Sequence, residues 1–123
     1  MKILLSIKPE FALKIFNGSK RYEYRRTIFK QGEVKTVVVY ASDPVKQVIG
    51  EFEIGEILYE EPEVLWAKTK NQSGITRNRF LEYFDNKPKG YAIEVKVAQT
   101  YDIPIPLKNL MVPRPPQSFR YLW

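Results

Sequence analysis

Residues 20–57 hold three strand-like segments joined by short turns, and this run of strands limits the fold more than any other feature of the chain. The segments span residues 20–27, 34–42 and 48–57 and are rich in β-branched and aromatic residues. The turns between them are too short for the crossover helix that parallel neighbours need. The pattern argues against a doubly wound parallel sheet.

Helix-like segments lie on both sides of this run. Pro9 stands where the first residue of a helix belongs, and Asn17-Gly18 provides a left-handed stop, so we expect a helix over 9–17 after a strand over 1–7. Downstream, a helix over 64–70 with an acidic start and a second one capped by Thr76 are expected.

Alternating apolar residues at 91–97 predict another strand, and residues 118–122 a last one after an extended, proline-rich wrap. The order of elements predicts one α+β domain over residues 1–123. We expect a small β-barrel or strongly curved sheet of about five or six mostly antiparallel strands, with two or three helices packed around it.

The chain contains neither cysteine nor histidine. This excludes disulfides, zinc fingers, cysteine nucleophiles and Ser-His-Asp triads. Any catalytic proton transfer would fall to Asp, Glu, Lys, Tyr or the chain's amino terminus. Glu51, Glu53 and Glu56 lack the spacing of a carboxylate metal cluster, so we expect no metal and no cofactor.

The net charge of +6 is unevenly distributed: residues 43–63 hold seven acidic groups and one basic group, whereas both flanks are basic. If the chain ends meet, one face is positive, as in nucleic-acid or phosphate binders, although ordinary surface solubility explains the charge equally well. The acidic stretch 51–63 is a candidate contact for protein partners. No apolar run is long enough for a membrane span or a secretory signal, which predicts a cytoplasmic protein.

Residues 18–26 have the strongest functional character. On a strand, Glu23 and Arg25 share one face, while Tyr22, Tyr24 and Arg26 take the other. A carboxylate inside a small barrel needs a cation, and Arg25 or Lys20 is the nearest one. Such a pair at a barrel mouth could grip a base edge or a phosphate. An edge strand with solvated charges also fits the spacing.

The pattern Gly18-x-Lys20-x-x-Glu23-x-Arg25 resembles the G-x-K-x-x-E-x-R signature of the ASCH domain family, and the closing segment 116–121 looks like the end of its small stand-alone prokaryotic members. The resemblance implies a PUA-like β-barrel. It also implies a cleft that is lined by Lys20, Glu23 and Arg25, shaped by Gly18, and occupied by RNA or a nucleotide-like ligand.

Further residues are candidates for ligand binding, each with a plainer alternative. Lys8 could meet phosphate beside free helix amides or be merely solvated. Ser42 follows the clearest strand, where loops commonly have functional roles, but Ser42-Asp43-Pro44 is also an ordinary turn. The remaining candidates are Arg26 beside the signature and, in the tail, Gln117, Ser118 and Arg120.

These observations favour an RNA-binding module, in the role of a regulator of transcription, translation or RNA modification. The alternative is a small hydrolase that uses Lys20 and Glu23, either an amidohydrolase on modified cytidine or a ribonuclease. In the amidohydrolase pattern that the resemblance implies, a threonine stands at the position of Glu23, so its hydroxyl nucleophile is absent here. A protein-interaction adaptor is the third alternative.

Overall fold

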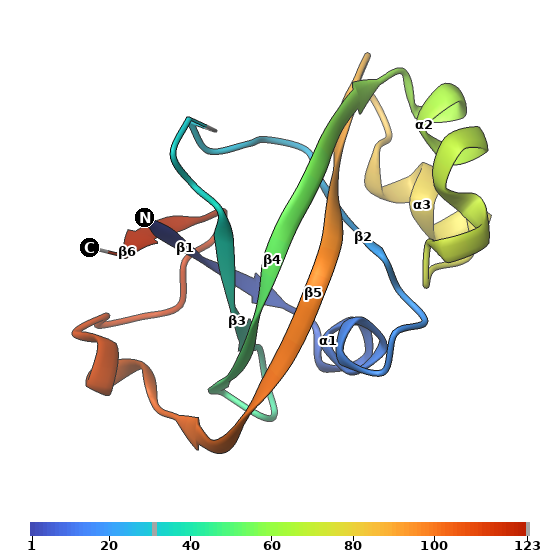
Figure 1. Cartoon of the computed structure of the whole chain (residues 1–123). Helices are drawn as coiled ribbons and strands as arrows, with labels where there is room; N and C mark the ends of the chain where they lie inside the picture. Colours follow the sequence, from blue (N-terminus) through green and yellow to red (C-terminus); the bar gives the residue numbers. More distant parts are fainter. Residues whose placement is uncertain (31, 123) are drawn as a thin grey trace.

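The computed structural model describes residues 1–30 and 32–122, and within them one six-stranded sheet forms the centre of the molecule (Figure 1). Its strand order is β2-β5-β4-β3-β1-β6. Strands β1 and β3 are parallel, and the other pairings are antiparallel. The predicted α+β class with mostly antiparallel strands is therefore confirmed. The strands are β1 (Lys2–Ile7), β2 (Tyr22–Arg25), β3 (Thr36–Ala41), β4 (Gln47–Glu60), β5 (Gly90–Ile105) and β6 (Arg120–Leu122).

Strands β4 and β5 are much longer than the others and bend along their length. Their pairing shifts register at several points, one of them between Ile54 and Ile57. There the side chain of Glu94 accepts a hydrogen bond from the backbone N–H of Glu56 at 2.9 Å. Such bulges increase the local twist of a sheet. The twist curls the sheet around its concave side.

The curled sheet is not closed by a backbone ladder, because β2 and β6 remain its two edges. Side chains bridge the gap. Arg25 Nη2 donates to the carbonyl of Ser118 at 2.8 Å, and the hydroxyls of Thr27 and Ser118 are 2.9 Å apart. The backbone N–H of Lys30 donates to the hydroxyl of Tyr121 at 2.8 Å. The expected barrel is thus a strongly curved sheet whose edges are held together by these contacts.

Three α-helices accompany the sheet: α1 (Pro9–Phe16), α2 (Pro62–Thr69) and α3 (Arg77–Tyr83). Helix α1 begins at Pro9 and ends before Gly18, whose φ is +88°, as the sequence predicted. The Thr76 side chain caps α3 by accepting from the N–H of Arg79 at 3.3 Å. Within the described residues, no helix is long and apolar enough to cross a membrane.

Two short 3-10 helices, η1 (Lys70–Gln72) and η2 (Leu107–Leu110), complete the elements. Helix η2 interrupts the expected extended wrap, and β5 continues well past the predicted 91–97. Both differences come from tertiary contacts that the local sequence pattern does not reveal. The second half of β5 pairs with β4, and the leucines of η2 pack against an apolar cluster formed by β1, β3 and β4.

Apolar side chains gather in three clusters. The largest fills the concave side of the sheet beneath α1 and includes Ile3, Val37, Phe52 and Ile93. The second lies under η2, and the third joins Tyr24 and other β2 and β5 residues to α2 and α3. Tyr22 and Tyr24 of β2 thus belong to this third cluster, whereas Glu23 and Arg25 alternate with them along the strand and form an ion pair.

Candidate functional site

A cleft of about 510 Å³ opens where the end of β1, the start of α1, strand β2 and helix α3 meet. Its volume lies within the roughly 300–1,000 Å³ typical of small-ligand sites. Segments far apart in the sequence form its walls, including the C-terminal segment through Gln117. The residues that line it are Ser6, Ile7, Lys8, Phe11, Lys20, Glu23, Tyr24, Arg25, Ile75, Arg79, Glu82, Tyr83 and Gln117.

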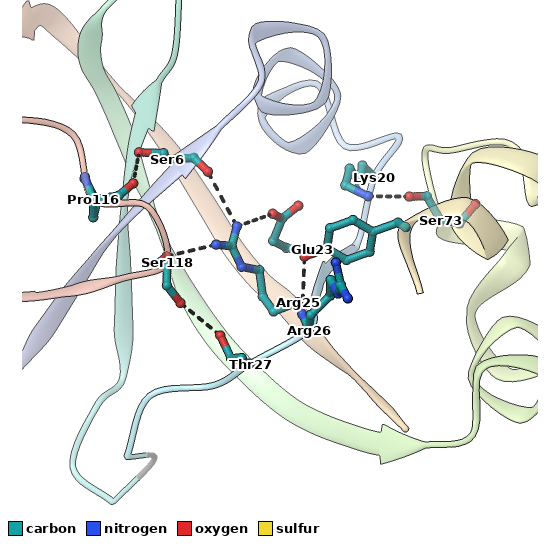
Figure 2. Close-up of polar contacts among 10 residues, drawn as sticks. Ser6, Lys20, Glu23, Arg25, Arg26, Thr27, Ser73, Pro116 and Ser118 are labelled. Carbon is teal, nitrogen blue, oxygen red and sulfur yellow. Dashed lines mark hydrogen bonds and ion pairs between the residues drawn. The ribbon is translucent and has the colours of Figure 1, made fainter. Parts of the chain in front are cut away.

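Lys20 lies at the bottom of this cleft and is only 2% exposed. Its backbone N–H donates to the carbonyl of Lys14 at 3.0 Å, so the turn at Gly18 aims the residue back under α1. The amine Nζ donates to the carbonyl of Ser73 at 2.7 Å (Figure 2). It also lies 4.7 Å from the ring centroid of Tyr24. These contacts replace only part of the hydration that a free ammonium group has in water.

Burial lowers the pKa of Lys20 from its ordinary 10.5 to about 8. The nearby Glu23 carboxylate opposes this shift, and the positive charge of Lys14 adds to it. Lys20 is therefore mostly charged at neutral pH, and a substantial fraction becomes neutral near pH 8.

Glu23 and Arg25 form an ion pair beside this lysine, as strand alternation predicts. Arg25 Nη1 donates to Glu23 Oε2 at 3.3 Å, and the two side chains are 14% and 9% exposed. Arg25 also donates to the carbonyls of Ser118 at 2.8 Å and Ser6 at 3.5 Å (Figure 2). Because protein acceptors already engage its guanidinium, Arg25 joins β1, β2 and the C-terminal segment and is poorly placed to grip a phosphate.

Two tyrosines add hydroxyls to the cleft wall. The hydroxyl of Thr69 donates to the carbonyl of Leu65, so the 2.6 Å contact between Tyr24 and Thr69 has Tyr24 as donor. Burial raises the pKa of Tyr24 to about 12 and also raises the pKa of Tyr83. Both phenols are neutral at physiological pH. The oxygen of Tyr83 accepts from the N–H of Arg26 at 3.2 Å, which leaves its own proton available to a ligand.

Cations lie at the rim of the cleft. Lys8 is exposed, and within the described part of the chain its side chain has no hydrogen bond or ion pair. Arg79 pairs with Glu10 at 3.0 Å and lies 4.7 Å from the ring centroid of Phe11. The rim therefore presents an accessible lysine, Lys8, beside an arginine that Glu10 already pairs, whereas the interior holds a buried amine near a carboxylate.

The structure brings five of the predicted ligand-binding residues into the cleft: Lys8, Lys20, Glu23, Arg25 and Gln117. Ser118 borders it through its carbonyl.

The other four predicted residues do not line the cleft. Gly18 forms the turn before Lys20, and the side chain of Arg26 is exposed. Ser42 lies at the end of β3, where its N–H donates to the carbonyl of Ile7. Arg120 is exposed on the edge strand β6. These residues are close in sequence to the cleft-forming segments, but the fold turns them outward or into backbone contacts.

Sequence reasoning did not place Phe11, Arg79 or Tyr83 in the cleft. Phe11 has the helical spacing of a core residue, and Tyr83 has no marker in its local sequence. Their role depends on α1 and α3 meeting across β2, which no local pattern encodes.

The acidic stretch 51–63 is largely paired within the molecule. Glu51 contacts Lys2 at 3.1 Å, and Glu63 contacts Arg77 at 2.9 Å. These contacts reduce the charge that the stretch offers to a protein partner, and that role stays a prediction. Among residues 1–30 and 32–122, no three acidic side chains are grouped to hold a metal ion.

Comparison with known proteins identifies a domain family and several relatives. Residues 5–104 match the ASCH domain. The "ASCH domain-containing ribonuclease" of Zymomonas mobilis is 31% identical over 123 residues, covering 97% of this chain and 82% of the relative. The "Large ribosomal subunit protein uL22" of Ureaplasma parvum is 28% identical over 120 residues, covering 98% of this chain but only 39% of that protein's length.

Solved structures agree with these matches. The crystal structure of ASCH from Zymomonas mobilis superposes with a TM-score of 0.91 at 29% identity, covering 99% of this chain and 87% of that chain. The N-terminal domain of McrB from Staphylothermus marinus, at 15% identity and a TM-score of 0.51, shares the fold alone.

Proposed function

The chain belongs to the ASCH domain family, and on that premise we propose that it binds single-stranded RNA and holds one unstacked nucleotide in the cleft. The observation that supports this most is the composition of the cleft: a buried amine beside a carboxylate at the bottom, aromatic side chains on the walls and an unpaired lysine at the rim. Unpaired bases in RNA are recognised by such stacking and edge contacts.

The arrangement suits a nucleotide that enters base first. Phe11, Tyr24 and Tyr83 offer apolar surface to a base, and Glu23 offers an acceptor for its N–H groups. The phosphate would remain at the rim, where Lys8 is free and Arg79 is close. The name of one relative, a ribonuclease, agrees with an RNA ligand. A regulatory role in transcription, translation or RNA modification stays a prediction.

The test is the affinity for a short mixed-sequence single-stranded RNA, measured by fluorescence anisotropy. We expect Lys8→Ala and Lys20→Met each to weaken binding several-fold, because each removes a cation from the path of the ligand. Lys108→Ala is the matched control, since Lys108 is an exposed lysine of η2 outside the cleft. Equal affinities for all four proteins would refute the cleft as the site.

RNA cleavage is a second candidate, favoured by the lowered pKa of Lys20. It requires a different pose, with the ribose and its phosphate at the bottom of the cleft: there a neutral Lys20 amine could take the proton of the 2′-hydroxyl while that oxygen bonds to phosphorus and the bond from phosphorus to the 5′-oxygen breaks. The departing oxygen would take a proton from the Tyr83 phenol, whose own proton is available. The products would be a 2′,3′-cyclic phosphate and a free 5′-hydroxyl.

The two candidates differ in their dependence on pH. Binding that needs the Lys20 ammonium should weaken as pH rises through about 8, whereas cleavage that needs the neutral amine should accelerate over the same range. Assays of affinity and of cyclic-phosphate product from pH 6.5 to 9 separate them. Product that persists in Lys20→Met would contradict the role of Lys20 as base.

A further inference from the structure

The loop of residues 72–75, which begins with the last residue of η1 and leads toward α3, lies along the side chain of Lys20. The Ser73 carbonyl accepts the hydrogen bond of the Lys20 amine at 2.7 Å, and the Gln72 carbonyl accepts from the N–H of Arg21 at 2.8 Å. Gly74 lies against the aliphatic part of the lysine: a Cβ added there would be 2.5 Å from Lys20 Cβ, 2.7 Å from Cγ and 3.0 Å from Cδ. The loop therefore touches Lys20 from its first side-chain carbon to its amine.

Two properties of position 74 require glycine. Its φ is +66°, in the left-handed region that L side chains rarely adopt. In addition, the space beyond its Cα is filled by the buried stem of Lys20. Gly18 shares only the first property, because its φ is +88° but a Cβ there would meet nothing within 4 Å. The close approach to Lys20 is thus specific to Gly74.

The loop is also fixed by contacts that do not involve Lys20. Ser73 is 4% exposed, and its hydroxyl donates to the carbonyl of Ile75 at 3.0 Å. Lys14 of α1 donates from Nζ to the carbonyl of Gly74 at 3.2 Å. A loop anchored on both sides can hold a flexible lysine in one place, which a solvent-exposed segment could not do.

We propose that residues 72–75 form a clamp that positions the Lys20 amine in the cleft, with Gly74 as the positioning residue that gives the lysine stem its room. Among the described residues, the clamp gives the amine one hydrogen-bond acceptor, the Ser73 carbonyl, and holds it 4.7 Å from the ring centroid of Tyr24. Its importance for RNA binding rests on the proposed function, whereas its effect on the position of the Lys20 amine does not.

The test compares Gly74→Ala with Gly32→Ala. The alanine Cβ at position 74 should displace the Lys20 stem and expose the amine, whereas Gly32 has nothing within 4 Å of an added Cβ. NMR of ¹³C-labelled lysine side chains follows the titration of Lys20, assigned by its loss in Lys20→Met. We expect the midpoint to move from about 8 toward the ordinary 10.5 in Gly74→Ala, by at least one pH unit, and to stay in place in Gly32→Ala. RNA affinity should fall about tenfold in Gly74→Ala alone.

Two further variants test the clamp where Gly74→Ala is unstable or does not fold. Gly18→Ala reports the stability cost of a left-handed alanine without contact to Lys20, so a larger cost for Gly74→Ala measures the contact. If Gly74→Ala does not fold, Ser73→Ala loosens the same turn by removing the hydroxyl contact with Ile75, and the Lys20 midpoint should rise by a smaller amount.

The outcomes separate the clamp from the proposed function. An unchanged Lys20 midpoint in the folded variants would overturn the clamp, even if RNA binds to the wild type. A raised midpoint in a protein that binds no RNA would support the clamp and refute the proposed function.

Discussion

Lys20 is a buried base, and its charge destabilises the folded protein at neutral pH. Its pKa is about 8 in the folded chain and 10.5 when unperturbed, so between these values the unfolded chain binds a proton that the folded chain does not. The free energy of unfolding should therefore increase as pH rises from about 8. Each pH unit within this window contributes at most about 1.4 kcal/mol.

Urea denaturation at pH 7.5, 8.5 and 9.5 checks this prediction. The range stops below the ordinary tyrosine pKa, because Tyr24 and Tyr83 have raised pKa values and produce the opposite trend at higher pH. Lys20→Met should be more stable than wild type at pH 7.5 and should not gain stability up to pH 9.5. A decline in wild-type stability over this range would contradict the shift.

Arg25 is the cation that makes the buried carboxylate of Glu23 tolerable. Arg25→Met would leave that carboxylate without its partner and release the carbonyl of Ser118. Breaking a buried pair in this way costs roughly 3 kcal/mol. Arg26→Met should change the unfolding free energy by less than about 0.5 kcal/mol, because the side chain of Arg26 is exposed. Equal urea midpoints for the two variants would show that the pair is not stabilising.

At the level of elements, the C-terminal segment closes the curved sheet. Phe119, just before β6, packs edge-on against Phe29 at 6.0 Å and against Tyr121 at 5.6 Å. Its ring is half-buried, so we expect Phe119→Ala to cost about 2 kcal/mol, less than a fully buried phenylalanine. Met111→Ala is the control, because Met111 is 87% exposed.

The same variant tests whether this segment also shapes the cleft. Loss of the Phe119 anchor should loosen Gln117, so RNA affinity should decrease together with the free energy of unfolding. Amide hydrogen exchange along β1 should also become faster, because β6 is its antiparallel partner. Unchanged β1 protection would contradict the closing role of the segment.

For the whole molecule, the cations that are free to meet phosphate set how strongly RNA affinity depends on salt. The net charge is +6, but many surface charges are engaged in ion pairs, among them Arg79 with Glu10, and the cleft rim offers the exposed Lys8. Each phosphate neutralised contributes about −0.7 to the slope of log affinity against log salt for a single strand. Contact of one phosphate with Lys8 predicts a slope of about −0.7, which Lys8→Ala should remove. A steeper slope that Lys8→Ala leaves unchanged would indicate contact over a wider surface.

Local sequence signals predict most of the helices and strands, and one strand of the cleft. Local signals are strong where the chain controls its own conformation: Pro9 begins α1, Gly18 ends it, and Thr76 caps α3. Alternation along β2 placed Glu23 and Arg25 together because neighbouring residues of a strand face opposite sides.

The rest of the cleft depends on tertiary packing. The Ser73-Gly74 loop contacts Lys20 from a distant part of the chain, and Phe11 and Tyr83 line the same cleft from α1 and α3, and no spacing rule connects these positions. The burial that lowers the pKa of Lys20 has the same origin, since desolvation depends on what surrounds a side chain and not on its neighbours in sequence. The helix ends and the alternation along β2 follow from residues that are close in sequence, whereas the lowered pKa of the Lys20 amine follows from tertiary packing.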